Sequence, residues 1–119
     1  VSMVTAGHPP ILQYIHNQDA IEEHRMHNIA LGISPDSRFE SKTIPFHTND
    51  IFCFITDGLT ETYNVKNEQY GMDRLKILIQ KFPLLSAEIM NASMIETVKR
   101  FSDGQELSDD ITSVVTQIQ

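Results

Sequence analysis

The chain has 119 residues, of which 40% are apolar and 21% are charged, and its formal net charge at pH 7 is −7. This length suits a single domain with its own core, and the composition is that of a folded globular protein. The negative charge would repel phosphate backbones and anionic lipids, so we expect neither nucleic acid nor a membrane surface as a partner.

The first part of the chain indicates short strands separated by turns. Residues 1–6 are β-prone, and the His-Pro-Pro sequence at 8–10 ends them, because proline cannot donate to a strand ladder. Residues 11–16 resume as a strand, and the polar residues 17–19 predict the turn of a hairpin-like pair. The polar and poorly periodic residues 20–28 predict irregular structure.

Two further strands are expected before the middle of the chain. Residues 30–34 are a short apolar piece, and residues 38–46 alternate as a partly exposed or edge strand does. Residues 51–56 begin with Ile-Phe-Cys-Phe-Ile, which predicts a buried strand. Cys53 is the only cysteine, so an intrachain disulfide is excluded and a small core residue is expected.

The second half of the chain has a helical period. Apolar residues recur at i, i+3 and i+4 in 72–82 and 86–101, which predicts two helices with Ser86 as the N-cap of the second. Residues 111–118 return to a strand pattern. The order predicts an α/β (α+β) fold with mainly antiparallel strands. The helical side chains expected to pack on the sheet are Leu75, Leu78, Ile79, Met90, Met94 and Val98.

Carboxylates stand at the ends of two predicted strands. Asp57 follows the buried strand, and Asp109 and Asp110 precede the last one. Antiparallel neighbours would bring these ends together, and the carboxylates would repel each other without a cation between them. Such hard oxygen ligands suit Mg²⁺ or Mn²⁺. The residue types also allow a purely structural interpretation, because Asp-Gly and Asp pairs are common in turns.

Four segments, read in order, are similar to one protein family. They are TAGHPPILQYI (5–15), ALGI (30–33), DIFCFITDGLTETYN with YGMDRL (50–64 and 70–75) and SDDITSVV (108–115). Together they resemble the C-terminal part of the PPM-type, metal-dependent protein serine/threonine phosphatases, in their bacterial SpoIIE/RsbU-like branch. Ala30 and Tyr70 depart from the usual Pro and Phe. The resemblance implies that 1–119 is the C-terminal part of one domain, an antiparallel β-sandwich flanked by helices and incomplete at the N-terminus.

The resemblance also implies site residues and an activity. Asp57 matches the family's metal-ligating Asp of the Thr-Asp-Gly motif, Asp109 matches the Asp that holds the same metal from the last strand, and Asp110 is expected to support these ligands. The implied reaction is hydrolysis of phosphoserine or phosphothreonine on a protein, with two Mn²⁺ or Mg²⁺ ions in the complete domain. The implied substrates are phosphorylated antagonists of anti-sigma factors, which are signalling proteins.

The family's Asp-x-x-Gly-His-Gly segment, whose Asp bridges two metals, has no counterpart here. We therefore expect these 119 residues alone to be inactive and to bind one ion weakly, and a non-catalytic binding or regulatory module of the same fold is the alternative. A zinc or nickel site on His24 and His27 is a further, weaker possibility. Unpaired strand edges predict self-association. The sequence shows no signal peptide and no apolar run of the ~20 residues that a membrane span needs, which predicts a cytoplasmic location.

Overall fold

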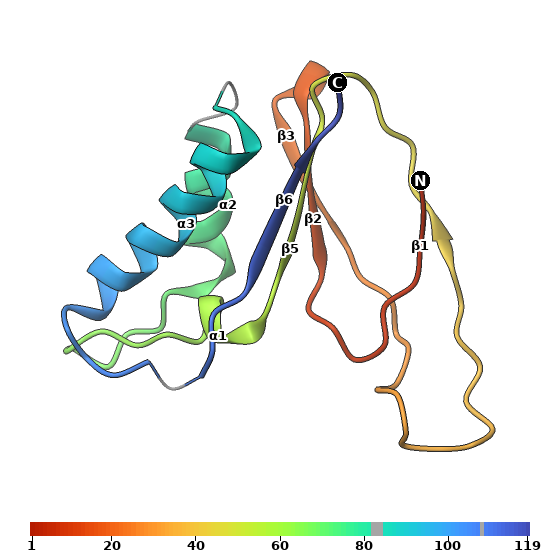
Figure 1. Ribbon diagram of the computed structural model, residues 1–119, viewed down its shortest axis with the longest axis horizontal. Coiled ribbons are helices and arrows are strands. Elements are labelled where there is room, and N and C mark those ends of the chain that lie inside the picture. Colours follow the sequence, from red (N-terminus) through yellow and green to blue (C-terminus); the bar gives the residue numbers. More distant parts are fainter. Residues whose placement is uncertain (82–84, 108) are drawn as a thin grey trace.

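The computed structural model describes residues 1–81, 85–107 and 109–119 of the chain. Its elements form three layers: two helices cover one face of a four-stranded sheet, and a two-stranded ladder lies on the other side (Figure 1). The predicted fold class, a mixed α/β protein with antiparallel strands, is confirmed. Within the described ranges, no helix is long and apolar enough to cross a membrane.

Four strands form the main sheet in the order β3-β2-β5-β6, and each neighbouring pair is antiparallel. They are β2 (Ile11–Ile15), β3 (Ala20–His24), β5 (Ile51–Ile55) and β6 (Ser113–Gln117). The short 3-10 helix η1 (His16–Gln18) joins β2 to β3, and Asp19 completes the hairpin with a φ of 48°. Strand β5 is one of the two inner strands, and its Cys53 pairs with Leu12 on one side and Val115 on the other.

Both predicted helices are present. They are α2 (Gly71–Lys81) and α3 (Ala87–Ser102). Ser86 is the N-cap of α3, as predicted, because its side chain accepts a hydrogen bond from the amide of Ile89. Asp103 ends α3 in the left-handed conformation, with a φ of 52°.

The main core lies between the helices and the sheet. A strand presents every second side chain to one face, so alternate residues of β2 and β5 meet the apolar stripes of α2 and α3. All six side chains predicted to pack there do so, and Leu78 is the one that is only partly buried. The buried members are Leu12, Tyr14, Ile51, Cys53, Ile55, Leu59, Tyr70, Leu75, Ile79, Met90, Met94 and Val98. This packing fixes the position of β5 and of the residues that follow it.

A smaller core lies on the opposite face of the sheet. There β1 (Ser2–Met3) pairs antiparallel with β4 (Lys42–Thr43). The backbone amide of Ile44 donates to the carbonyl oxygen of Val1, and the amino terminus donates to the carbonyl of Ile44, both at 2.8 Å. The buried members of this cluster are Ile11, Ile44 and Phe52.

Several predicted elements differ in the structure. Residues 20–28, expected to be irregular, begin with β3. Their polar side chains do not indicate a strand, but the backbone forms one because it pairs with the buried strand β2. The strands predicted at 1–6 and 38–46 shorten to β1 and β4, which pair only with each other over two residues. The apolar piece 30–34 is an exposed turn. The predicted end of the first helix at residue 82 lies outside the described residues.

Candidate metal-binding site at the ends of two strands

The site predicted from the sequence lies where β5 ends and β6 begins. Because these strands are antiparallel neighbours, the two ends meet at one edge of the sheet. One further backbone hydrogen bond, from the amide of Thr56 to the carbonyl of Thr112 at 3.0 Å, extends the pairing. Asp57 therefore follows β5 at the same edge at which Asp109 and Asp110 lead into β6, as the strand order predicts.

The hydroxyl of Thr56 holds the two strand ends together. It accepts a hydrogen bond from the amide of Thr112 at 2.9 Å and donates one to the carbonyl oxygen of Asp110 at 3.2 Å. One hydroxyl can do both, because it has one donor and two acceptor lone pairs. Thr56 also precedes the short helix α1 (Asp57–Thr60), but its side chain makes no capping bond there. Its side chain thus serves the contact between the strands and not its own helix.

Gly58 allows the two segments to approach closely. A Cβ atom at this position would lie 2.5 Å from the carbonyl oxygen of Asp110 and 3.3 Å from the carbonyl carbon of Asp109. The carbonyl oxygen of Gly58 accepts a hydrogen bond from the buried hydroxyl of Thr62 at 2.7 Å. Leu59, which is fully buried, anchors α1 in the main core. Glycine is therefore required here because any side chain would clash with residue 110, and not because of its backbone dihedral angles.

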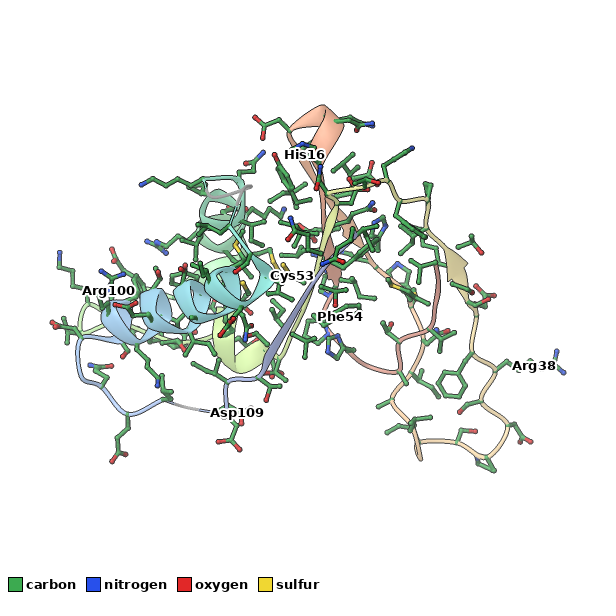
Figure 2. All side chains as sticks on the ribbon, turned by 45° about the horizontal axis from the view of Figure 1, so that its top comes forward. His16, Arg38, Cys53, Phe54, Arg100 and Asp109 are labelled. Carbon is green, nitrogen blue, oxygen red and sulfur yellow. The ribbon has the colours of Figure 1, made fainter. Side chains whose placement is uncertain are left out.

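Both candidate ligands are exposed at this edge, and Figure 2 shows Asp109 near the start of β6. The carboxylate of Asp57 accepts a hydrogen bond from the amide of Gly58 at 3.0 Å, and that of Asp109 accepts one from the amide of Asp110 at 2.7 Å. Within the described part of the chain, neither carboxylate forms an ion pair. Both therefore remain available to a cation.

The donors fit a hard divalent ion in kind, because carboxylate oxygens are the ligands that Mg²⁺ and Mn²⁺ prefer. They are few, however. Among the described residues, no group of three or more His, Cys, Asp or Glu side chains is arranged to hold a metal. Asp57 and Asp109 alone would offer a metal ion only part of the ligands that it needs. Asp110 supports Asp109 through its amide and Thr56 through its carbonyl oxygen.

The weaker metal site considered for His24 and His27 gains no support. His24 is 4% exposed, and its Nε2 lies 2.8 Å from the side-chain oxygen of Gln13. Its Nδ1 lies 3.4 Å from the ammonium group of Lys42. Both ring nitrogens are therefore already in contact with other side chains, and His24 is a buried polar residue at the end of β3.

A buried polar network at the other end of the sheet was not predicted. Asp50, which is fully buried, accepts hydrogen bonds from the side chain of Gln13 at 3.0 Å and from the amides of His16 and His47 at 2.9 and 3.0 Å. Figure 2 shows His16 at the end of the molecule opposite Asp109. The sequence did hold a signal, because a glutamine within an apolar strand needs buried partners.

Cys53 is the buried core residue that the sequence predicts. It is 1% exposed at the centre of the sheet, and burial raises the pKa of its thiol to about 12. Thiolate chemistry requires a lowered pKa and access to solvent. Cys53 has neither, so its part in the molecule is packing.

Comparison with known proteins gives one family. The family model described as Stage II sporulation protein E (SpoIIE) matches residues 1–119, which is the whole chain. Protein IcfG of Synechocystis sp. is 28% identical over 116 residues, which make up 96% of this chain and 18% of that protein. The chain thus spans less than a fifth of the curated relative that it matches.

Several solved structures share the fold, among them the following two. The SiaA-PP2C domain of Pseudomonas aeruginosa superposes with a TM-score of 0.80 at 14% identity, over 93% of this chain and 44% of that one. The phosphatase domain of the cell fate determinant SpoIIE from Bacillus subtilis superposes with a TM-score of 0.72 at 17% identity, over 98% of this chain and 50% of that one. At these identities the likeness shows a common fold, that of PPM phosphatase domains, and this chain corresponds to about half of each.

Proposed function

Because the chain belongs to the SpoIIE family, we propose that it forms part of a metal-dependent phosphatase that hydrolyses phosphoserine or phosphothreonine on a protein. One observation carries the proposal. Thr56 and Gly58 hold the end of β5 against the start of β6, so that Asp57 and Asp109 stand at one edge of a rigid sheet.

Asp57 and Asp109 would hold a Mn²⁺ or Mg²⁺ ion at this edge. A bound divalent ion supplies positive charge that polarises a phosphoryl oxygen and lowers the pKa of a coordinated water. The contribution of the chain itself is to position the carboxylates. The buried strand β5 fixes the backbone from which Asp57 projects, and the hydrogen bonds of Thr56 fix the backbone next to Asp109.

The substrate that we propose is a phosphorylated regulatory protein of the anti-sigma antagonist kind. SpoIIE of Bacillus subtilis, whose phosphatase domain shares the fold, is described as a cell fate determinant, which is a regulatory role. An acidic chain also disfavours the competing phosphoesters of nucleic acids, because their backbones would be repelled.

A second candidate is a non-catalytic module that keeps the fold and binds a regulatory partner. It is favoured by the absence, among the described residues, of a three-ligand group of metal-binding side chains. Catalysis by the first candidate therefore requires further ligands from chain outside the described residues, whereas the second candidate requires none.

The test is a phosphatase assay on the full-length protein that contains these residues, with a phosphoserine peptide and Mn²⁺ or Mg²⁺. Asp57→Asn and Asp109→Asn should each lower the rate at saturating metal about 100-fold or more, because loss of a direct ligand should cost at least as much as loss of a supporting residue. Titration calorimetry with Mn²⁺ should show weaker binding in both variants.

Asp103→Asn is the matched control, because Asp103 is an exposed aspartate at the C-cap of α3 and belongs to neither strand end. It should keep the parental rate and affinity. If Asp57→Asn and Asp109→Asn both kept near-parental rates, the assigned ligands would be wrong. If the full-length protein proved inert with either ion, the non-catalytic module would replace the phosphatase.

A further inference from the structure

A cleft with basic side chains lies on the side of the sheet away from the helices. It has a volume of about 440 Å³ and lies between β4 and the connection from β3 to β4. In Figure 1 this connection is drawn in orange to yellow at the side opposite α2 and α3. We call it the basic cleft, and its charged or polar lining includes Arg25, His27, Asn28, Arg38, Glu40 and Lys42.

The basic cleft concentrates positive charge in an acidic chain. The cleft is lined by three of the nine Lys and Arg residues, namely Arg25, Arg38 and Lys42, and by a single carboxylate, that of Glu40. In the whole chain, by contrast, acidic residues outnumber basic ones sixteen to nine. Arg38 makes no ion pair with any described residue. Arg25 is 2.5 Å from the carboxylate of Glu23, but Glu23 also pairs with Lys76, so one carboxylate is shared between two cations. The cleft therefore keeps uncompensated positive charge.

A buried histidine positions the ammonium group of Lys42 at the cleft. Lys42 can only donate, so His24 Nδ1 is the acceptor at 3.4 Å, and Nε2 carries the proton that His24 donates to the side-chain oxygen of Gln13 at 2.8 Å. The amide group of Gln13 in turn donates to buried Asp50 at 3.0 Å. This chain of hydrogen bonds runs from Asp50, just before β5, through β2 and β3 to β4, and it directs the exposed side chain of Lys42 toward His24.

Asn28 fixes the walls of the basic cleft. Its side-chain amide donates to the carbonyl oxygens of Thr5 and Glu40 at 3.0 and 2.9 Å, and its side-chain oxygen accepts from the amide of Glu40 at 3.0 Å. Its backbone carbonyl accepts from the amide of Gly7 at 3.3 Å. One side chain thus joins three segments beyond the two-residue pairing of β1 with β4, which favours a preformed cleft.

We propose that the basic cleft binds an acidic segment of a partner protein. The charge complements carboxylate side chains, and the volume exceeds what a single inorganic anion needs, being in the range of sites that hold much larger ligands. Single-stranded nucleic acid is disfavoured, because none of the lining residues is Phe, Tyr or Trp, whose large rings would form a stacking platform for successive bases. The proposal is independent of the metal site and requires no hydrolysis.

The test uses the full-length protein and a fluorescein-labelled peptide of six glutamates, with the anisotropy of the label as the readout. Binding should weaken as salt is raised, because exposed charges are screened. Arg38→Gln should weaken it roughly two- to fivefold, the usual effect of one exposed charge pair. A triple variant, Arg25→Gln with Arg38→Gln and Lys42→Gln, should weaken it at least about tenfold. The exposed side chain of Arg38 forms no hydrogen bond, ion pair or ring contact with another described residue, so its replacement should leave the melting temperature unchanged.

The matched control makes the same change of net charge elsewhere. It combines Lys66→Gln, Lys99→Gln and Arg100→Gln, which lie outside the cleft, and Figure 2 shows Arg100 at the end of the molecule opposite Arg38. This control should keep the parental affinity. Equal weakening in both triple variants would mean that net charge alone attracts the peptide, and the proposal would fail. It would fail equally if a six-glutamine peptide bound as tightly, or if inorganic phosphate bound to the cleft while the glutamate peptide did not.

Discussion

Gly58 faces the carbonyl oxygen of Asp110 so closely that a Cβ atom on the glycine would lie 2.5 Å from that oxygen. Gly58→Ala should therefore push residues 109 and 110 away from α1. We expect the free energy of unfolding to fall by about 1–3 kcal/mol, the usual cost of overpacking. We also expect Mn²⁺ affinity in the full-length protein to fall, because Asp109 moves relative to Asp57. Urea unfolding and calorimetry measure the two effects.

Gly104→Ala is the control for Gly58→Ala. It introduces backbone strain without a steric contact that would displace Asp109 or Asp110. Gly104 has a φ of 82°, so alanine is strained there by about 1 kcal/mol, but nothing lies within 4 Å of the added Cβ. This variant should lose stability and keep the parental Mn²⁺ affinity. Equal loss of affinity in both variants would show that the close contact of Gly58 with Asp110 does not position the ligand.

Asp50 supports the end of the sheet opposite the candidate site. Asp50→Ala would leave the amides of His16 and His47 without this acceptor and would remove one of the two acceptors of the Gln13 side-chain amide. Because one buried and two partly buried donors lose a charged partner at once, we expect a loss of about 3 kcal/mol or more in the free energy of unfolding. Asp36→Ala, in an exposed turn, is the control and should change stability by less than about 0.5 kcal/mol. A similar small change for Asp50→Ala would contradict the assigned network.

Cys53 should be inert in the folded protein. The thiol is 1% exposed and its pKa is raised to about 12 by burial, so at pH 8 it offers little thiolate and no access. We expect no reaction with a disulfide reagent until urea unfolds the chain, and then one thiol per molecule. Rapid stoichiometric labelling under native conditions would contradict the placement of Cys53 at the centre of the sheet.

The elements that the sequence predicts well are those whose pattern is local. The stripes of α2 and α3 and the apolar run of β5 depend on spacing within one segment, and Ser86 caps α3 through a bond three residues away. The meeting of Asp57 with the segment of Asp109 also followed from the sequence, because it needs only two antiparallel neighbours. Whether both carboxylates bind one ion stays a prediction.

The elements that the sequence predicts poorly depend on partners far along the chain. β3 has polar residues at most positions, and it is a strand because buried β2 pairs with it over five residues. The Asp50 network joins residues 37 and 34 positions apart, so no local pattern contains it. The basic cleft likewise depends on Asn28, whose contacts with Thr5 and Glu40 close the space between distant segments.

The expected self-association has a structural basis at the edge strand β6. Val114 is 53% exposed on β6, and an apolar hollow of about 360 Å³ beside it is lined by Phe46, Phe54 and Ile118, among others. Exposed edges and apolar area promote pairing between chains. We predict that residues 1–119 alone associate at high concentration and that Val114→Lys reduces this. Ile77→Lys, on α2, is the control and should not. A monomer at every concentration in sedimentation would contradict the prediction.

His24 should make the stability depend on pH. Burial is the main cause that lowers its pKa below 6.5 in the folded protein, the ammonium of Lys42 lowers it further, and Glu22 opposes the shift. The unfolded chain therefore takes up a proton at higher pH than the folded one does. The contribution of His24 to the free energy of unfolding should be fully present above about pH 6.5. It should fall by at most about 1.4 kcal/mol per pH unit as the pH drops toward the folded-state pKa, and the free energy of unfolding should level off below that pKa. Urea unfolding between pH 5 and 8 measures this dependence, and His24→Gln should flatten it while His27→Gln, at an exposed position, should not. Parallel curves for the parent and His24→Gln would show that burial of His24 beside Lys42 does not lower its pKa in the folded protein.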